Sequence, residues 1–185
     1  MAYFKIGYPD SNGSWNVMRV DKDGVIEARD SYANEIFRGY HFYIGSYAVL
    51  NSGGSVIFAV TTPNTNEWVH MRFVVDATTT TKVEVYEDSS VTGGTPQTPI
   101  NSNRNSSKQA SLSVVLNPTV NSLGSLIDSN KFGSSSKPSV FGGDVAREDE
   151  IVLKQNTTYI YKFTSEADNN TISYRGYWYE RAGLW

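Results

Sequence analysis

An alternation of polar and apolar residues recurs along most of this sequence, whereas the apolar spacing of an amphipathic helix is almost absent. In residues 82–86 (KVEVY) the two valines fall on the same face of a pleated strand. Residues 56–60 (VIFAV) are continuously apolar, which indicates a strand covered on both faces. The same alternation occurs in residues 69–75, 112–116 and 172–178. The pattern predicts a fold made almost entirely of β-strands.

Turn-forming residues separate the predicted strands. Asp23-Gly24 lies between two short apolar runs and is the strongest hairpin signal in the chain. Turns between later strands are indicated by residues 51–54, 92–94 and 168–170. Strands at this spacing, without crossover helices between them, predict an all-β antiparallel sandwich or jelly roll. Residues 30–38 are the one segment whose pattern also fits a single helical turn.

A domain boundary is predicted between residues 48 and 49. Residues 1–48 contain a small hairpin signal around residues 17–29 and are expected to form an N-terminal arm or hairpin, for attachment or oligomerisation. Residues 49–185 contain the later strand signals and are expected to form the sandwich. Residues 92–108 and 129–144 are predicted long loops, which either cross the surface or are functional and ordered by a partner.

Charge and cysteine content exclude several classes of partner. The 185 residues have a net charge of −3 and a pI of about 5.4, without the dense run of Lys and Arg that would neutralise phosphates, so we expect no nucleic acid partner. The absence of cysteine excludes disulfides and favours folding in the cytosol. No apolar run approaches the length of a membrane span, and no apolar signal region follows Met1, so we expect no membrane partner.

The sequence carries no recognisable catalytic or metal-binding pattern. It has no Gly-x-Ser-x-Gly elbow, and its two histidines, His41 and His70, are not clustered with carboxylates at metal-ligand spacing. A carboxylate pair for glycoside hydrolysis is defined by distance in space, so the sequence leaves that possibility open. We expect a protein that is not an enzyme and that uses no cofactor or metal.

Aromatic residues are more numerous than a core alone requires. The chain includes 12 Tyr, 8 Phe and 4 Trp. Residues 177–179 (YWY) place aromatic side chains on both faces of one predicted strand, so that one face is expected to meet a neighbouring molecule. Aromatic side chains are favoured in protein interfaces and equally on sugar-binding platforms. The aromatic interface candidates are Trp68, Tyr177, Tyr179 and Trp185.

Several blocks of residues, in order and spacing, resemble a family of bacteriophage virion proteins, the capsid decoration or cement proteins. Together the blocks cover about residues 49–181, and their conjunction is more specific than any one of them. The blocks are 58–63 (FAVTTP), 68–70 (WVH), 83–87 (VEVYE), 93–94 (GG), 98–106 (TPINSNRNS), 153–159 (LKQNTTY), 164–170 (TSEADNN) and 178–180 (WYE).

The resemblance implies a jelly-roll-like sandwich that binds and stabilises the outer surface of a capsid. Its partners would then be the major capsid protein and further copies of itself, as a trimer rather than a dimer. The protein would be made in the host cytoplasm and located on the virion surface. Under this hypothesis the loop side chains of Asn101, Asn103, Arg104 and Asn105 are further interface candidates, although the same side chains could instead order their own loop.

Two other functions remain open at this stage. One is a head-fibre or tail-fibre module that binds a carbohydrate receptor, because residues 20–26 (VDKDGVI) resemble short β-elements of such proteins and aromatic residues suit sugars. The other is a tail-spike glycan hydrolase. A fibre predicts elongated repeats, which this sequence lacks.

Overall fold

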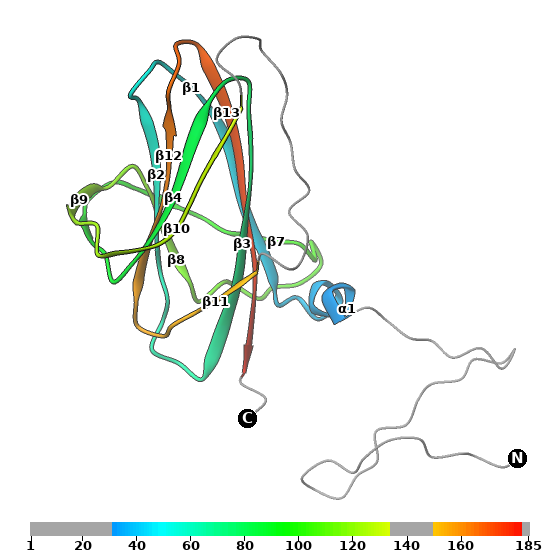
Figure 1. Cartoon of the computed structure of the whole chain (residues 1–185). Coiled ribbons are helices and arrows are strands. Elements are labelled where there is room, and N and C mark those ends of the chain that lie inside the picture. Colours follow the sequence, from blue (N-terminus) through cyan, green and yellow to red (C-terminus); the bar gives the residue numbers. More distant parts are fainter. Residues whose placement is uncertain (1–30, 134–149, 183–185) are drawn as a thin grey trace, which may run out of the picture. The chain divides into compact units, whose positions relative to one another are not determined.

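The computed structural model of the protein describes residues 31–133 and 150–182. Within these residues the fold is nearly all β with one short helix, and two antiparallel sheets pack face to face (Figure 1). The predicted all-β sandwich is confirmed, while its jelly-roll type stays a prediction. The chain divides into two compact units, Met1–Asn34 and Glu35–Trp185, and the strands described here belong to the second. The hairpin predicted around residues 17–29 lies outside the described residues.

The two sheets contain five and six strands. In spatial order the five-stranded sheet contains β11 (Ile151–Leu153), β3 (Glu67–Ala77), β13 (Asn170–Ala182), β1 (His41–Leu50) and β7 (Ile100–Asn101). The six-stranded sheet contains β10 (Ser125–Phe132), β4 (Thr81–Glu87), β12 (Thr158–Ser165), β2 (Ser55–Thr61), β8 (Ser113–Leu116) and β6 (Thr95–Gln97). A separate pair consists of β5 (Ser90–Thr92) and β9 (Thr119–Ser122), and the helix α1 spans Ser31–Arg38.

Alternate side chains of both sheets meet in one hydrophobic core. Phe58 of β2 packs against two rings of the opposite, five-stranded sheet, with centroid distances of 4.9 Å to Tyr174 and 5.7 Å to Phe73. Aromatic pairs at these separations add to the stabilisation that comes from area burial. The predicted alternation is confirmed, because the inward-facing residues that it identified are buried in this core: Val69, Met71, Val85, Leu112, Val114, Ile172, Tyr174 and Trp178.

A second, smaller hydrophobic cluster lies on the other side of the six-stranded sheet. Ala59, Tyr86 and Ile160 are buried there, under Val91 of β5 and Val120 of β9. The short β5–β9 pair therefore covers part of the sheet that would otherwise face water. This arrangement confirms the prediction that residues 56–60 form a strand covered on both faces.

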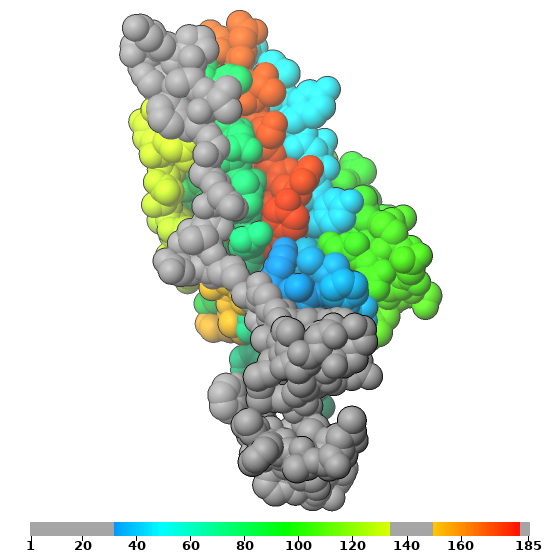
Figure 2. All heavy atoms as spheres, turned by 90° about the vertical axis from the view of Figure 1, so that its right-hand side faces the viewer, coloured from blue at the N-terminus to red at the C-terminus, as the bar shows by residue number. Residues whose placement is uncertain are grey.

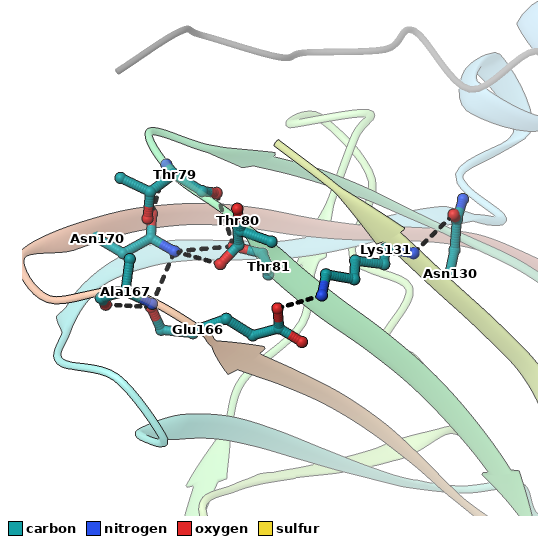
Figure 3. Close-up of polar contacts among 9 residues, drawn as sticks. Thr79, Thr80, Thr81, Asn130, Lys131, Glu166, Ala167 and Asn170 are labelled. Atoms are coloured by element: carbon teal, nitrogen blue, oxygen red, sulfur yellow. Dashed lines mark hydrogen bonds and ion pairs between the residues drawn. The ribbon is translucent and has the colours of Figure 1, made fainter. Parts of the chain in front are cut away.

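A polar network fastens the turn that precedes β13 (Figure 3). Asn170 is fully buried, and its side-chain oxygen accepts a hydrogen bond from the backbone N–H of Thr79 at 3.0 Å. Its amide nitrogen donates to Thr81 Oγ1 at 2.8 Å and to Ser165 Oγ at 3.0 Å. One side chain thereby joins the β3–β4 turn to the β12–β13 turn, which connects the two sheets at this end.

Two predicted loops and the predicted boundary differ from the structure, whereas the predicted helical turn is present. In the predicted loop 129–144, residues 129–132 instead form part of β10, and residues 134–144 lie outside the described residues. β10 lies at a sheet edge and exposes almost every residue, so no apolar alternation marks it. The predicted loop 92–108 includes the short strands β6 and β7. The helical turn suggested for residues 30–38 is present as α1. The strand β1 continues across the predicted boundary between residues 48 and 49.

Candidate functional site

Most of the aromatic interface candidates predicted from the sequence lie on the outer face of the five-stranded sheet, the face turned away from the core. Val69 and Met71 of β3 point into the core, so Trp68, His70 and Arg72 point outward. Figure 2 looks toward this sheet, with β13 in red between β3 in green and β1 in blue to cyan. In β13, Trp178 is buried, so its two neighbours, Tyr177 and Tyr179, point to the outer face because successive side chains of a strand alternate. Three of the four predicted aromatic candidates therefore share one face; the fourth, Trp185, lies outside the described residues.

Four outward side chains form a tyrosine–arginine cluster, defined as Tyr43, Arg72, Arg175 and Tyr177. The strand register places Tyr177 opposite Tyr43 on one side and opposite Arg72 on the other. The guanidinium carbon lies 5.2 Å from the Tyr177 ring centroid for Arg72 and 5.8 Å for Arg175. Arg175 also donates a hydrogen bond from Nη1 to the hydroxyl of Tyr177 at 3.1 Å. Tyr177 is thus within cation–π range of two guanidinium groups.

A glycine makes room for Arg175 on this face. Gly45 of β1 is the register partner of Arg175. A Cβ atom at residue 45 would lie 3.1 Å from Arg175 Nε and 3.2 Å from its Cγ, which is tighter than an ordinary van der Waals contact. The absence of that atom lets the arginine lie across β1, where its guanidinium carbon is 5.9 Å from the Tyr43 ring centroid.

A second polar group lies beside the tyrosine–arginine cluster. The rings of His70 and Tyr179 stack with a centroid distance of 4.4 Å. One carboxylate oxygen of Glu150 lies 2.7 Å from His70 Nδ1 and accepts a hydrogen bond from the Tyr179 hydroxyl, also at 2.7 Å. Glu150 immediately precedes β11, so this contact connects the edge of the sheet to its centre. Tyr179 is consequently fixed in orientation by stacking and by hydrogen bonding.

His41 is the buried histidine of this face. It is 2% exposed, and its Nδ1 lies 2.6 Å from the hydroxyl oxygen of Ser102. Burial, together with the smaller effect of the nearby Arg72 charge, lowers the pKa of His41 to about 4. The imidazole is therefore neutral in the folded protein at neutral pH, which fits a packing role. Neither His41 nor His70 lies in a metal-binding group: the described part of the chain holds no cluster of three or more His, Cys, Asp or Glu residues that could bind a metal ion.

The low pKa of His41 predicts a pH-dependent stability. An unfolded histidine titrates near 6.5, so between pH 6.5 and about 4 the unfolded chain binds a proton that folded His41 does not. The stabilisation is therefore fully present above pH 6.5 and is lost as the pH falls through this window, by about 3 kcal/mol in free energy of unfolding. Denaturant unfolding at a series of pH values, for the wild type and for His41→Gln, measures this contribution.

Comparing the pH dependence of the unfolding free energy between wild type and His41→Gln separates the contribution of His41 from those of other titratable groups. Glu87, whose pKa is lowered by hydrogen bonds from Lys154 and Tyr159, also loses stabilisation in acid, but it does so in both proteins. The difference in unfolding free energy between wild type and His41→Gln is expected to shrink between pH 7 and pH 4. Parallel pH curves for the two proteins would show that His41 is not the responsible group.

The predicted loop candidates are divided between internal and exposed positions. Asn101 is buried, and its amide nitrogen donates to the carbonyls of Gly39 at 2.9 Å and Lys108 at 3.1 Å. Asn103 donates from its amide nitrogen to the carbonyl of Phe37 at 2.9 Å and accepts from the backbone N–H of Asn105 at 3.1 Å. Both side chains therefore order the loop. The exposed interface candidates in this loop are Arg104 and Asn105.

The sequence predicts only part of the tyrosine–arginine cluster. The alternation placed Arg72, Arg175 and Tyr177 on the outward faces of their strands. It could not show that β3 and β13 are neighbours, because their paired residues are about a hundred positions apart. Tyr43 belongs to residues 1–48, for which the sequence predicts an N-terminal arm and not a strand of the sandwich. The sequence signal for its position is the apolar pair Phe42 and Ile44, which flanks Tyr43 and is buried in the core.

The outer face of the five-stranded sheet offers rigid aromatic rings beside guanidinium donors. Tyrosine and arginine are, with tryptophan, enriched among the residues that dominate binding energy in protein interfaces, because they combine apolar area with hydrogen bonding. None of the helices in the described ranges is long and apolar enough to cross a membrane. No family model matches the chain, and no curated protein or solved structure is significantly similar to it.

Proposed function

We propose that this chain is a structural virion protein that binds and stabilises the outer surface of a bacteriophage capsid through the outer face of its five-stranded sheet. The observation that carries the proposal is the tyrosine–arginine cluster, in which Tyr177 is held by two arginines in the middle of that face. Side chains that are already ordered lose little conformational entropy when they bind. The cluster is therefore suited to a large, flat protein partner.

The capsid as the partner is supported by the resemblance of residues 49–181 to decoration proteins. Those residues contribute the strands of both sheets except β1. A protein that binds only the assembled shell stabilises the shell by its binding free energy. An oligomer that touches several shell subunits at once also gains from effective concentration, so each contact can be weak. Such a role requires a stable scaffold and an interface rather than a catalytic centre.

Binding to purified capsids that lack this protein tests the proposal. We expect the wild-type protein to bind in a saturable manner, with a fixed ratio to shell subunits, as seen by electron microscopy and sedimentation. Tyr177→Ala is expected to weaken binding by about 30-fold, the effect of losing one hot-spot side chain of about 2 kcal/mol. Leu126→Ala, on an exposed residue of the other sheet, is the matched control and should bind as the wild type does.

Two outcomes would contradict the proposal. Failure of the wild type to bind such capsids at any salt concentration would remove the assigned partner. Unchanged binding by Tyr177→Ala, with its fold verified by circular dichroism, would keep the partner but remove the assigned face.

A second candidate function is a carbohydrate-binding module of a head or tail fibre. The specific observation in its favour is the exposed Tyr47, which stands on the same face as Tyr43. Exposed tyrosine rings with arginine donors nearby suit the apolar faces and hydroxyls of sugars. A glycan array distinguishes the two functions: retention of one glycan class that is lost on Tyr47→Ala favours the fibre module.

A further inference from the structure

β1 lies at the edge of the five-stranded sheet for most of its length. On one side it pairs with β13 along the whole strand, from His41 to Leu50. On the other side β7 pairs only with Phe42 and Tyr43. Figure 1 shows β7 beside the end of β1 near α1, while β1 continues to the opposite end of the sandwich. No described strand pairs with residues 44–50 on that side.

The hydrogen bonds on either side of β1 show which of its backbone groups point outward. In an antiparallel ladder, alternate residues direct both their N–H and C=O groups to the same neighbour. The carbonyl of Tyr40 accepts from Glu180, so the even-numbered residues bond to β13. The carbonyl of His41 accepts from Ser102 on the other side, so the odd-numbered residues point away from β13. Beyond β7, the outward-directed residues are Gly45, Tyr47 and Val49.

Within the part of the chain that the structure describes, residues 44–50 of β1 carry no charge, proline or bulge that would protect this edge against strand pairing. Tyr47 is 68% exposed and Val49 is 61% exposed, and apart from His41 no titratable side chain other than tyrosine occurs from residue 39 to residue 66. Edge strands that must stay single usually carry charges, proline or a bulge. The edge strand β10 of the other sheet does carry them, with Asp128, Lys131 and a register shift between Leu126 and Asp128.

We infer that β1 pairs antiparallel with β1 of a second copy of this chain, about a two-fold axis centred on Tyr47, which gives a dimer in place of the trimer that the resemblance to decoration proteins implies. In this register Tyr47 of each copy stands opposite Tyr47 of the other, and Gly45 stands opposite Val49. All three pairs join outward-directed residues, so their N–H and C=O groups match. The two five-stranded sheets become one continuous sheet across the dimer, and the outer faces that carry the tyrosine–arginine clusters lie side by side.

Two observations favour a second copy over a strand of another protein. Residues 44–50 carry no charged side chain of their own, so pairing β1 with a second β1 places no like charges directly opposite each other. The register also sets the smallest residue of the edge opposite a branched one: Val49 of the second copy covers Gly45, against the stem of Arg175 that already lies there. In a two-fold pairing the β1 edge of each copy is occupied by the other copy, so no third copy can add through β1 and the assembly stops at the dimer.

Cysteine cross-linking tests the register, because the chain has no cysteine of its own. Residues directly opposite in a hydrogen-bonded pair have Cα atoms about 5.5 Å apart, within the range that a disulfide spans. Tyr47→Cys is therefore expected to form a disulfide-linked dimer under mild oxidation. Val49→Cys is the matched control: its two copies would lie about 14 Å apart, four residues along the strand, and should cross-link at least ten times more slowly.

Sedimentation of the full chain without any capsid tests the pairing itself. We expect a wild-type dimer, dissociation to monomer for Tyr47→Lys, and an unchanged dimer for Leu126→Lys on the other sheet. A wild-type monomer at 100 μM, a trimer, an unchanged size for Tyr47→Lys, or equal cross-linking of Val49→Cys would each overturn the inference. Because no capsid is present, such a failure is separate from a failure of the proposed capsid binding.

Discussion

Glu180→Ala is expected to lower the free energy of unfolding by about 3–5 kcal/mol, the largest effect of any single substitution proposed for this chain. Glu180 is 2% exposed and points between the sheets from β13. Its carboxylate accepts hydrogen bonds from the backbone and hydroxyl of Ser111 at 2.8 and 2.6 Å. It also accepts from the N–H of Leu112 at 3.1 Å and from Trp178 Nε1 at 2.9 Å.

The size of the expected effect follows from what the substitution leaves behind. Alanine would leave two buried donors, the Leu112 N–H and Trp178 Nε1, without an acceptor, and each unsatisfied buried group costs about 1–3 kcal/mol. The two donors of Ser111, which is exposed, would also lose their acceptor, at a smaller cost. It would also release the segment that leads into β8, so that one contact between the two sheets is lost. The measurement is denaturant unfolding followed by circular dichroism.

Two companion variants separate the causes. Glu180→Gln keeps the shape but turns an amide nitrogen toward the donors, and should cost about 1–3 kcal/mol. Glu166→Ala removes an exposed carboxylate that pairs with Lys131 and should cost less than about 1 kcal/mol. A Glu180→Ala protein as stable as Glu166→Ala would show that the four hydrogen bonds contribute little.

Asn170→Ala is expected to lower the free energy of unfolding by about 3 kcal/mol. The substitution removes the acceptor of the Thr79 N–H and the donor to Thr81 and Ser165, all at the end of the sandwich (Figure 3). The variant also lacks the side chain that connects the β3–β4 and β12–β13 turns. Urea unfolding of the purified variant, compared with the wild type at the same pH, gives the difference.

The matched control for Asn170→Ala is a second asparagine in the same view. Asn130 is exposed, and its side-chain oxygen accepts only the backbone N–H of the next residue, Lys131, at 2.7 Å among the contacts drawn in Figure 3. Asn130→Ala should change the stability by no more than about 0.5 kcal/mol. Equal effects of the two substitutions would mean that burial of the amide is not what makes Asn170 important.

The core of this fold was predictable because burial alternates along strands that have one buried and one exposed face. Residues 82–86 and 172–178 identify their own inward faces without any knowledge of their neighbours. The strand β10 lacked that signal, since it exposes almost all of its residues at the edge of a sheet. A polar edge strand is held by backbone hydrogen bonds, which leave little trace in the choice of side chains.

The candidate site was harder to predict than the core. The outward parity of Arg72 and Tyr177 followed from their own strands, but their contact depends on a register between segments distant in sequence. The same limit explains Asn101 and Asn103. Their residue type is equally suitable for binding a partner or for ordering a loop, and only the positions of the Gly39, Lys108 and Phe37 carbonyls reveal the second role.

The central position of β13 has a consequence for synthesis on the ribosome. β13 lies between β3 and β1, yet it is the last of the described strands to be made. Until it emerges, β1 has no long neighbour on either side, and β3 pairs at most with the three residues of β11. The nascent chain therefore holds two largely apolar strands that are unpaired along most of their length until β13 is made. Such segments are prone to aggregate, and we expect the five-stranded sheet to form late and to gain from chaperones that bind extended apolar chain.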